Sequence, residues 1–93
     1  MLGYFKKEGF NDQKYLIRYQ KSLIKEAFKL AESLRKKRYI VELELEINRP
    51  MEKTISYSRN KNIRYIIDIQ SEDLSRVYRY DLNTNQEETV SYD

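Results

Sequence analysis

The sequence contains no cysteine, no histidine and no tryptophan, and only two glycines and one proline occur among its 93 residues. Without cysteine, the chain has no disulfide framework and no thiolate metal site, which fits a reducing compartment. Without histidine, it also lacks the commonest general base and the commonest metal ligand. We therefore expect no catalytic residue, no metal and no cofactor, and a protein that binds a partner rather than an enzyme.

Other catalytic motifs are missing as well. Gly3 and Gly9 both precede the first expected element, so the chain has neither a glycine-rich phosphate loop nor a dinucleotide fingerprint. The best carboxylate cluster is Glu42, Glu44 and Glu46, whose spacing of about 6.6–7 Å along one strand face would suit a hydrated divalent cation. A charged solvent face is the simpler interpretation, and a metal-dependent enzyme is the least favoured hypothesis.

Long hydrophobic runs are also absent. Residues 1–8 lack the apolar core of a secretory signal, and no apolar stretch approaches the roughly 18 residues of a membrane span. Hydrophobic residues make up 40% of the chain and charged residues 35%, which is typical of a globular domain. We expect one soluble, cytoplasmic domain over residues 1–93, with a short lead-in over 1–10.

Positive and negative charges are separated along the chain. Residues 1–38 contain 11 lysines and arginines against 4 acidic residues, whereas residues 39–93 contain 7 against 11. The local net charges of +7 and −4 sum to the overall +3. The frequent tyrosine, lysine, asparagine and isoleucine are a bias that we associate with AT-rich coding sequence, as in low-GC bacteria, their phages and their plasmids.

A helical period predicts one long helix over residues 13–37. Asn11 or Asp12 is a suitable N-cap, and the cations at 35–38 would complement the negative end of the helix. The apolar residues recur at helical spacing and form one broad stripe, which comprises Leu16, Tyr19, Leu23, Ala27, Leu30, Ala31 and Leu34, flanked by Ile17, Ile24 and Phe28.

The period changes to two after residue 38. Strict alternation with glutamate predicts a strand over 39–47, and further strands are predicted over 53–59, 63–70 and 74–82, with a weaker fifth over 87–92. Short links between strands favour an antiparallel β-meander over 39–92. The predicted fold class is therefore α+β, with one long N-terminal amphipathic helix packed on a meander of four or five strands.

One face of the predicted helix is basic. At about 100° per residue, most of its cations fall on one arc nearly opposite the apolar stripe. They have few acidic partners one turn away, so the row could follow a phosphate backbone or meet an acidic protein groove. Solubility alone is the competing interpretation. This basic helix face comprises Lys14, Arg18, Lys21, Lys25, Lys29 and Lys36.

The outward face of the predicted sheet is the second candidate surface. Ile66 and Val77 would form a small apolar spot there, rimmed by charge and suited to a partner protein or to a homodimer. Most strand tyrosines are expected in the core, including Tyr78 and Tyr80, although an outward tyrosine could stack a base. The candidate open sheet face comprises Glu42, Glu44, Glu46, Arg64, Ile66, Val77 and Arg79.

Two functional hypotheses follow from these surfaces. The leading one is a small protein-binding module that docks on a larger protein and inhibits or modulates it. The composition would suit a phage or mobile element whose target is host defence or nucleic-acid machinery, and an anti-CRISPR-like inhibitor is one form of this hypothesis. The alternative is a nucleic-acid-binding protein that uses the basic helix face, with affinity that falls steeply with salt.

Overall fold

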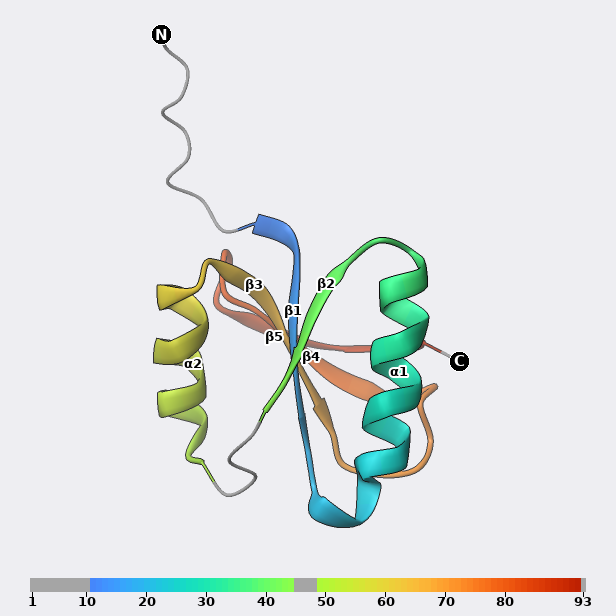
Figure 1. The fold of residues 1–93 in the computed structure, drawn as a ribbon. Coiled ribbons are helices and arrows are strands. Elements are labelled where there is room, and N and C mark those ends of the chain that lie inside the picture. The colour runs from blue at the N-terminus through green and yellow to red at the C-terminus, as the bar shows by residue number, and fades with distance from the viewer. Residues whose placement is uncertain (1–10, 45–48, 93) are drawn as a thin grey trace, which may run out of the picture.

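The computed structural model describes residues 11–44 and 49–92. Two helices and five strands form a layered α/β arrangement, with one helix on each side of a single sheet (Figure 1). In chain order the elements are β1 (Asn11–Tyr19), the 3-10 turn η2 (Lys21–Leu23), α1 (Ile24–Lys36), β2 (Ile40–Leu43), α2 (Met51–Asn60), β3 (Ile63–Ile69), β4 (Val77–Asp81) and β5 (Gln86–Val90).

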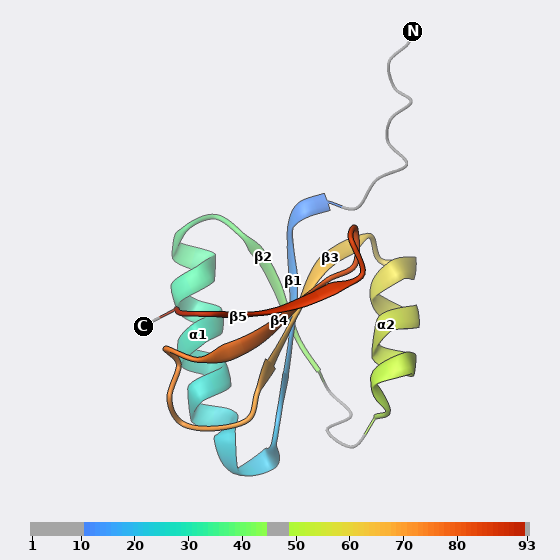
Figure 2. The same ribbon diagram turned by 180° about the vertical axis from the view of Figure 1, so that it is seen from behind.

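The sheet is mixed, with strand order β2-β1-β3-β4-β5. Strand β1 pairs in parallel with both β2 and β3, and β3, β4 and β5 then pair antiparallel. The α1 crossover leads to one side of β1 and the α2 crossover leads to the other side. Crossovers of the same hand in opposite directions place their helices on opposite sheet faces, as the two views show (Figures 1 and 2).

This architecture corrects the predicted fold class. The expected helix on an antiparallel meander is wrong, because the described sheet contains two parallel pairings and carries helices on both faces. Only the second half of the expected helix over 13–37 is helical. Its first half contains the interior strand β1, in which Tyr15, Leu16 and Ile17 are all buried. A strand covered on both faces reads as a continuous apolar run, which is compatible with either period.

Helix α2 is the second correction. The strand expected over 53–59 is instead helical, and the helix starts after Pro50, whose carbonyl accepts hydrogen bonds from the N–H groups of Lys53 and Thr54. Thr54 and Ser58 are fully buried one turn apart. These small side chains let the helix lie close to the sheet, so packing overrides the strand preference of the β-branched and aromatic residues in this segment.

The sheet separates two hydrophobic clusters. Under α1, Ile17, Leu30 and Ile67 belong to the larger cluster, whereas Leu16 and Ile66 belong to the smaller cluster under α2. Adjacent residues of β1 and of β3 therefore point into different layers, as the pleat of a strand requires. Together the two clusters bury almost every large aliphatic side chain of the central strands.

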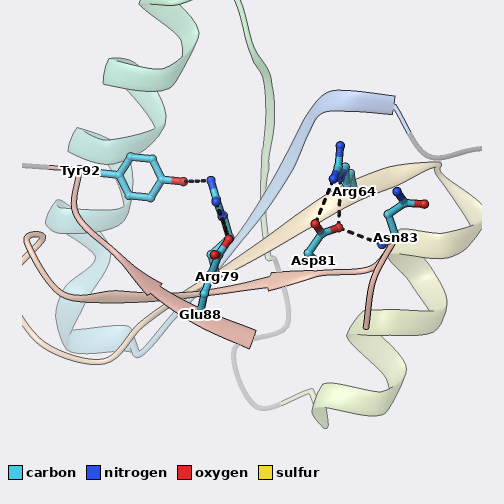
Figure 3. A network of polar contacts seen from close by, with 6 residues as sticks. All are labelled: Arg64, Arg79, Asp81, Asn83, Glu88 and Tyr92. Carbon is cyan, nitrogen blue, oxygen red and sulfur yellow. Dashed lines mark hydrogen bonds and ion pairs between the residues drawn. The ribbon is translucent and has the colours of Figure 1, made fainter. Parts of the chain in front are cut away.

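Ion pairs fasten the outer strands to the sheet (Figure 3). Arg64 on β3 donates from Nε and Nη2 to the two carboxylate oxygens of Asp81, at 3.0 and 3.1 Å, and the N–H of Asn83 also donates to Asp81. These hydrogen bonds, chiefly those from Arg64, lower the pKa of Asp81. On the neighbouring pair of strands, Arg79 binds Glu88. Each contact thus ties one strand to the next across the antiparallel half of the sheet.

Three left-handed residues end elements. Asn62 and Asn85 have φ of 59° and 57°, in the turns before β3 and β5, and asparagine tolerates this conformation better than most residues do. The third is Arg38, with φ of 73°, directly after α1. Among the described residues, no helix is long and apolar enough to cross a membrane.

Candidate nucleic-acid interface

The outer face of α1 combines cations with an exposed aromatic ring. Its inner face is buried through Ala27, Leu30, Ala31 and Leu34, so residues near the opposite side of the helix face solvent. Lys25, Lys29 and Lys36 lie there, and Lys21 is exposed in the preceding turn. The structure thus keeps four of the six cations of the predicted basic face together. Phe28 lies beside them with 55% of its surface exposed.

A shallow groove follows this helix face. It has a volume of ≈ 620 Å³ and is lined by Lys25, Phe28, Lys29, Glu32 and Arg35. Glu32 is its one acidic side chain. In the part of the chain that the structure describes, no carboxylate forms an ion pair with any of the three groove cations. The groove therefore presents net positive charge next to an exposed π-face.

The C-terminal end of α1 adds further cations, because the last turn and its cap hold Arg35, Lys36, Lys37 and Arg38. The N–H of Arg38 donates to the carbonyl of Arg35 at 2.9 Å, and the N–H of Tyr39 donates to that of Leu34 at 3.1 Å. This is a Schellman cap, whose left-handed position is usually glycine. Helix α2 uses asparagine, Asn62, at the equivalent position.

An arginine in the left-handed region costs roughly 1–2 kcal/mol relative to glycine. Backbone strain of this kind occurs most often at functional sites. The side chain of Arg38 is exposed, and it continues the row of cations beyond the end of the helix. Arg38 thus places a cation at a position that glycine usually occupies.

Such a surface suits a particular chemistry. Lysine ammonium groups neutralise phosphates without reading sequence, and an exposed aromatic ring can stack on any unpaired base. Positively charged grooves with aromatic platforms are the usual means of holding single-stranded nucleic acid. The face of α1 carries both components within about four helical turns.

Two members of the predicted basic helix face lie elsewhere. Lys14 and Arg18 belong to β1 and face α2, on the opposite side of the sheet from α1. Lys14 Nζ donates to the carbonyl of Lys61 at 3.1 Å. Arg18 donates to Thr54 Oγ1 at 3.0 Å and to the carbonyl of Arg49 at 3.0 Å. Arg18 thus anchors α2 to the sheet, and the prediction that it shares a helix face with the lysines is wrong.

The glutamates of the predicted open sheet face also lie under α2. Glu44 is only 3% exposed; it accepts a hydrogen bond from Thr54 Oγ1 at 2.7 Å and pairs with Arg49 at 3.3 Å. Glu42 accepts a hydrogen bond from the Tyr57 hydroxyl at 2.7 Å, which raises the pKa of Tyr57. Glu46 lies outside the described residues. Among the described residues, no cluster of three metal-binding side chains occurs.

The apolar spot predicted on an open sheet face does not exist. Ile66 is fully buried under α2, and Val77 is 1% exposed under α1, so the two residues lie on opposite faces. Their expected rim residues Arg64 and Arg79 form ion pairs with acidic groups of neighbouring strands. The predicted homodimer depended on this spot, so the structure gives it no support.

The tyrosines divide between core and surface. Tyr15 stacks on Tyr65 and meets Tyr39 edge-on, each at a ring-centroid distance of 5.0 Å, and Arg79 lies 4.6 Å from the ring centroid of Tyr65. Burial raises the pKa of the Tyr15 hydroxyl. Tyr78, expected in the core, is instead 42% exposed. The cause is that its alternation on β4 places it on the α2 side, beyond the part of the sheet that α2 covers.

The fold places the chain among known structures, although neither a protein-family model nor a curated protein matches its sequence. It resembles part of histidyl-tRNA synthetase from Nostoc sp. PCC 7120, with a TM-score of 0.74 and 20% identity over 86% of this chain and 20% of that chain. The apo S. aureus histidyl-tRNA synthetase gives a TM-score of 0.68 and 16% identity, over 91% of this chain and 25% of that chain.

A third similar structure is Giardia lamblia prolyl-tRNA synthetase in complex with prolyl-adenylate. Its TM-score is 0.69 with 14% identity, over 86% of this chain and 19% of that chain. At these identities the similarity shows the fold alone. The chain spans a quarter or less of the length of each of these enzymes.

Proposed function

We propose that this chain is a non-catalytic RNA-binding domain that holds single-stranded RNA along the outer face of α1. The observation that carries the proposal is the exposed Phe28 beside Lys25 and Lys29, in a groove whose cations outnumber its one carboxylate. The resemblance to parts of three tRNA synthetases supports RNA as the nucleic acid. This is the alternative hypothesis of the sequence analysis.

The hypothesis of an inhibitor that docks on a larger protein has lost its proposed apolar contact spot. Its proposed contact surface required Ile66 and Val77 on one exposed face, and both are buried. The fold resemblance to synthetases gives no support to a phage or anti-CRISPR origin. The RNA hypothesis, by contrast, rests on side chains that are exposed and lie close together.

The composition of the surface indicates how RNA would be held. Direct reading of base edges usually relies on arginine, asparagine or glutamine, whereas this face offers mainly lysine. We therefore expect this face of α1 by itself to contribute little sequence preference. Phe28 can stack only on a base that is free of its duplex neighbours, so single-stranded RNA should bind more tightly than duplex RNA.

A charge-reversal pair tests this proposal. Lys29→Glu changes a lysine of the groove. Lys53→Glu changes an exposed lysine of α2 by the same net charge and serves as the control. Each phosphate contact on single-stranded RNA releases about 0.7 counterion. At 50 mM salt, the loss of one such contact should therefore lower the affinity about 8-fold. Fluorescence anisotropy should show at least this loss for Lys29→Glu and less than about twofold for Lys53→Glu.

Phe28→Ala separates stacking from charge. Since the ring is largely exposed, the variant should change the free energy of unfolding by less than about 0.5 kcal/mol. Loss of one stacked base should lower the affinity for single-stranded RNA roughly 10-fold and leave the affinity for duplex RNA unchanged. No RNA binding by the unmodified chain at 50 mM salt, or equal effects of Lys29→Glu and Lys53→Glu, would refute the proposal.

A further inference from the structure

A second aromatic site lies on the other side of the sheet, at the end that α2 leaves uncovered. Strand register places Asp68, Tyr78 and Thr89 side by side across β3, β4 and β5. Helix α2 packs on Ile66 and Leu82 at the far end of these strands. The ring of Tyr78 therefore stays 42% exposed on a bare patch of sheet.

Tyr78 forms one wall of a pocket with a volume of ≈ 290 Å³. The other walls come from the β3–β4 loop and from β5, and the lining side chains are Gln70, Ser71, Asp73, Arg76, Tyr78 and Thr89. This volume is close to the lower end of the range of about 300–1,000 Å³ for small-molecule sites. The pocket thus combines one aromatic face, one cation and several hydrogen-bonding groups in a space that suits one planar group.

The loop that forms the pocket has a defined shape. The carboxylate of Asp73 accepts hydrogen bonds from the N–H of Ser75, at 3.0 Å, and from the Ser75 hydroxyl. The N–H of Asp73 donates to Ser71 Oγ at 3.3 Å, and Leu74 is buried in the core. These contacts hold the carboxylate of Asp73 in place at the pocket, so little ordering of this group would be needed when a ligand binds.

The pocket lies close to the start of α1. Leu74 belongs to the same hydrophobic cluster as Leu23, which ends the turn before α1. Both views show the β3–β4 loop beside the start of that helix (Figures 1 and 2). Lys21 in the turn and Arg76 in the loop are both exposed. The turn before α1 and the β3–β4 loop therefore each carry an exposed cation.

We propose that this pocket binds one unpaired nucleobase of the RNA that lies along α1, with the base stacked on Tyr78 and its edge directed at Asp73. The inference rests on the proposed function and adds a base-binding site to it. Hydrogen bonds from Ser75 lower the pKa of Asp73, so its carboxylate is ionised and acts only as an acceptor. A carboxylate acceptor favours cytosine, which offers an amino group at its edge, over uracil, whose N–H donor is flanked by two carbonyl oxygens that repel the carboxylate.

Three substitutions in the full chain test the pocket. Tyr78→Thr removes the ring and keeps a residue that favours strands, Tyr78→Phe keeps the ring, and Asp73→Asn keeps the loop-forming acceptor oxygen but removes the charge. Anisotropy would be measured with oligocytidine and oligouridine of about 12 nucleotides and with a duplex RNA of similar length. This set separates stacking, edge recognition and backbone contacts.

The expected results differ for each variant. Tyr78→Thr should lower the affinity for oligocytidine about 10-fold and leave duplex binding unchanged. Tyr78→Phe should bind both RNAs like the unmodified chain. Asp73→Asn should remove the preference for oligocytidine over oligouridine. If Tyr78→Thr binds oligocytidine as tightly as the unmodified chain does, or if the unmodified chain binds both oligomers equally, the inference is overturned while RNA binding by α1 stands.

A second measurement tests the pocket independently of the groove on α1. The isotope-labelled chain would be titrated with cytidine and uridine monophosphates while backbone amide resonances are followed. Shifts of the Tyr78 and Thr89 amides that are larger for cytidine monophosphate, and that disappear in Tyr78→Thr, support the pocket even if the chain binds no long RNA. Absence of these shifts overturns the pocket whatever α1 does.

Discussion

The salt dependence of RNA binding gives the most quantitative consequence of the proposed interface. Lys21, Lys25, Lys29 and Lys36 are exposed along one side of the molecule, and each is assigned one phosphate contact. On single-stranded RNA each contact contributes a slope of about −0.7 in log affinity against log salt, so these four lysines alone should give about −2.8, and a contact by Arg38 adds to it. Between 50 and 200 mM salt the affinity should therefore fall by at least about 50-fold.

The double substitution Lys25→Gln and Lys29→Gln removes two of these contacts. The slope should drop by about 1.4, and the loss of affinity relative to the unmodified chain should shrink from about 65-fold at 50 mM salt to about 10-fold at 200 mM. Anisotropy titrations at four or more salt concentrations give both quantities, with Lys53→Gln as the control on α2. An unchanged slope in the double variant would refute the assignment of these lysines to phosphates.

Three further predictions concern the fold. Arg38→Gly should raise the free energy of unfolding by about 0.5–1 kcal/mol, because relief of the left-handed arginine is partly offset by the greater freedom of glycine in the unfolded chain. The same variant should weaken RNA binding, and Asn62→Gly should stabilise the fold less. Because burial raises the pKa of Tyr15, the folded chain should keep full stability below pH about 10 and lose up to about 1.4 kcal/mol per pH unit above it, and Tyr15→Phe should lose less over the same range. Because Arg64 lowers the pKa of Asp81, stability present above pH about 4 should fall at lower pH, and Asp81→Asn should show a smaller fall. Urea denaturation at each pH measures all three effects, and a variant that follows the unmodified chain would contradict the corresponding assignment.

The sequence was informative where one periodicity excluded the other. Residues 24–36 have a helical stripe with charged residues opposite it, and the structure has α1 there. Strands β3, β4 and β5 lie within, or within one residue of, the segments whose alternation predicted them. The helix has only one strongly apolar face, and the strands alternate regularly, so the local pattern agrees with the burial that the structure shows.

Each of the two wrong assignments has a physical cause. In β1, the run Tyr15, Leu16 and Ile17 is buried on both faces, and such a run extends a neighbouring helical stripe equally well. In α2, the buried positions are the small polar residues Thr54 and Ser58, which give no hydrophobic stripe. The buried hydroxyl of Thr54 is hydrogen-bonded by Arg18 and Glu44, which lie on other elements, so the local pattern around residue 54 contains no signal for its burial.

The candidate site was only partly visible in the sequence. The lysines of α1 were identified from their spacing, whereas Lys14 and Arg18 were grouped with them only because β1 was assigned to the same helix. Phe28 was counted as a flank of the apolar stripe. Once the helix is shortened to 24–36, a helical wheel centred on Ala27, Leu30 and Leu34 places Phe28 toward solvent.

Tyr78 could not have been found in this way, because its exposure depends on how far α2 extends over the sheet. The same holds for Ile66, which is buried only because a second helix exists on its face. Which strand face is open is a property of the whole topology. Because the pattern of α2 does not indicate a helix, the sheet face that α2 covers was predicted to be open and was assigned to binding.

The most direct test of the central claim is to locate bound RNA on the molecule. The isotope-labelled chain would be titrated with a single-stranded RNA of about 12 nucleotides at low salt while its backbone amide resonances are followed. We predict that the largest shifts occur along α1 and at its C-terminal cap, around Lys25, Phe28 and Arg38. Shifts concentrated on the outer face of α2 around Lys53, or no shifts in α1 at saturating RNA, would contradict the proposed function.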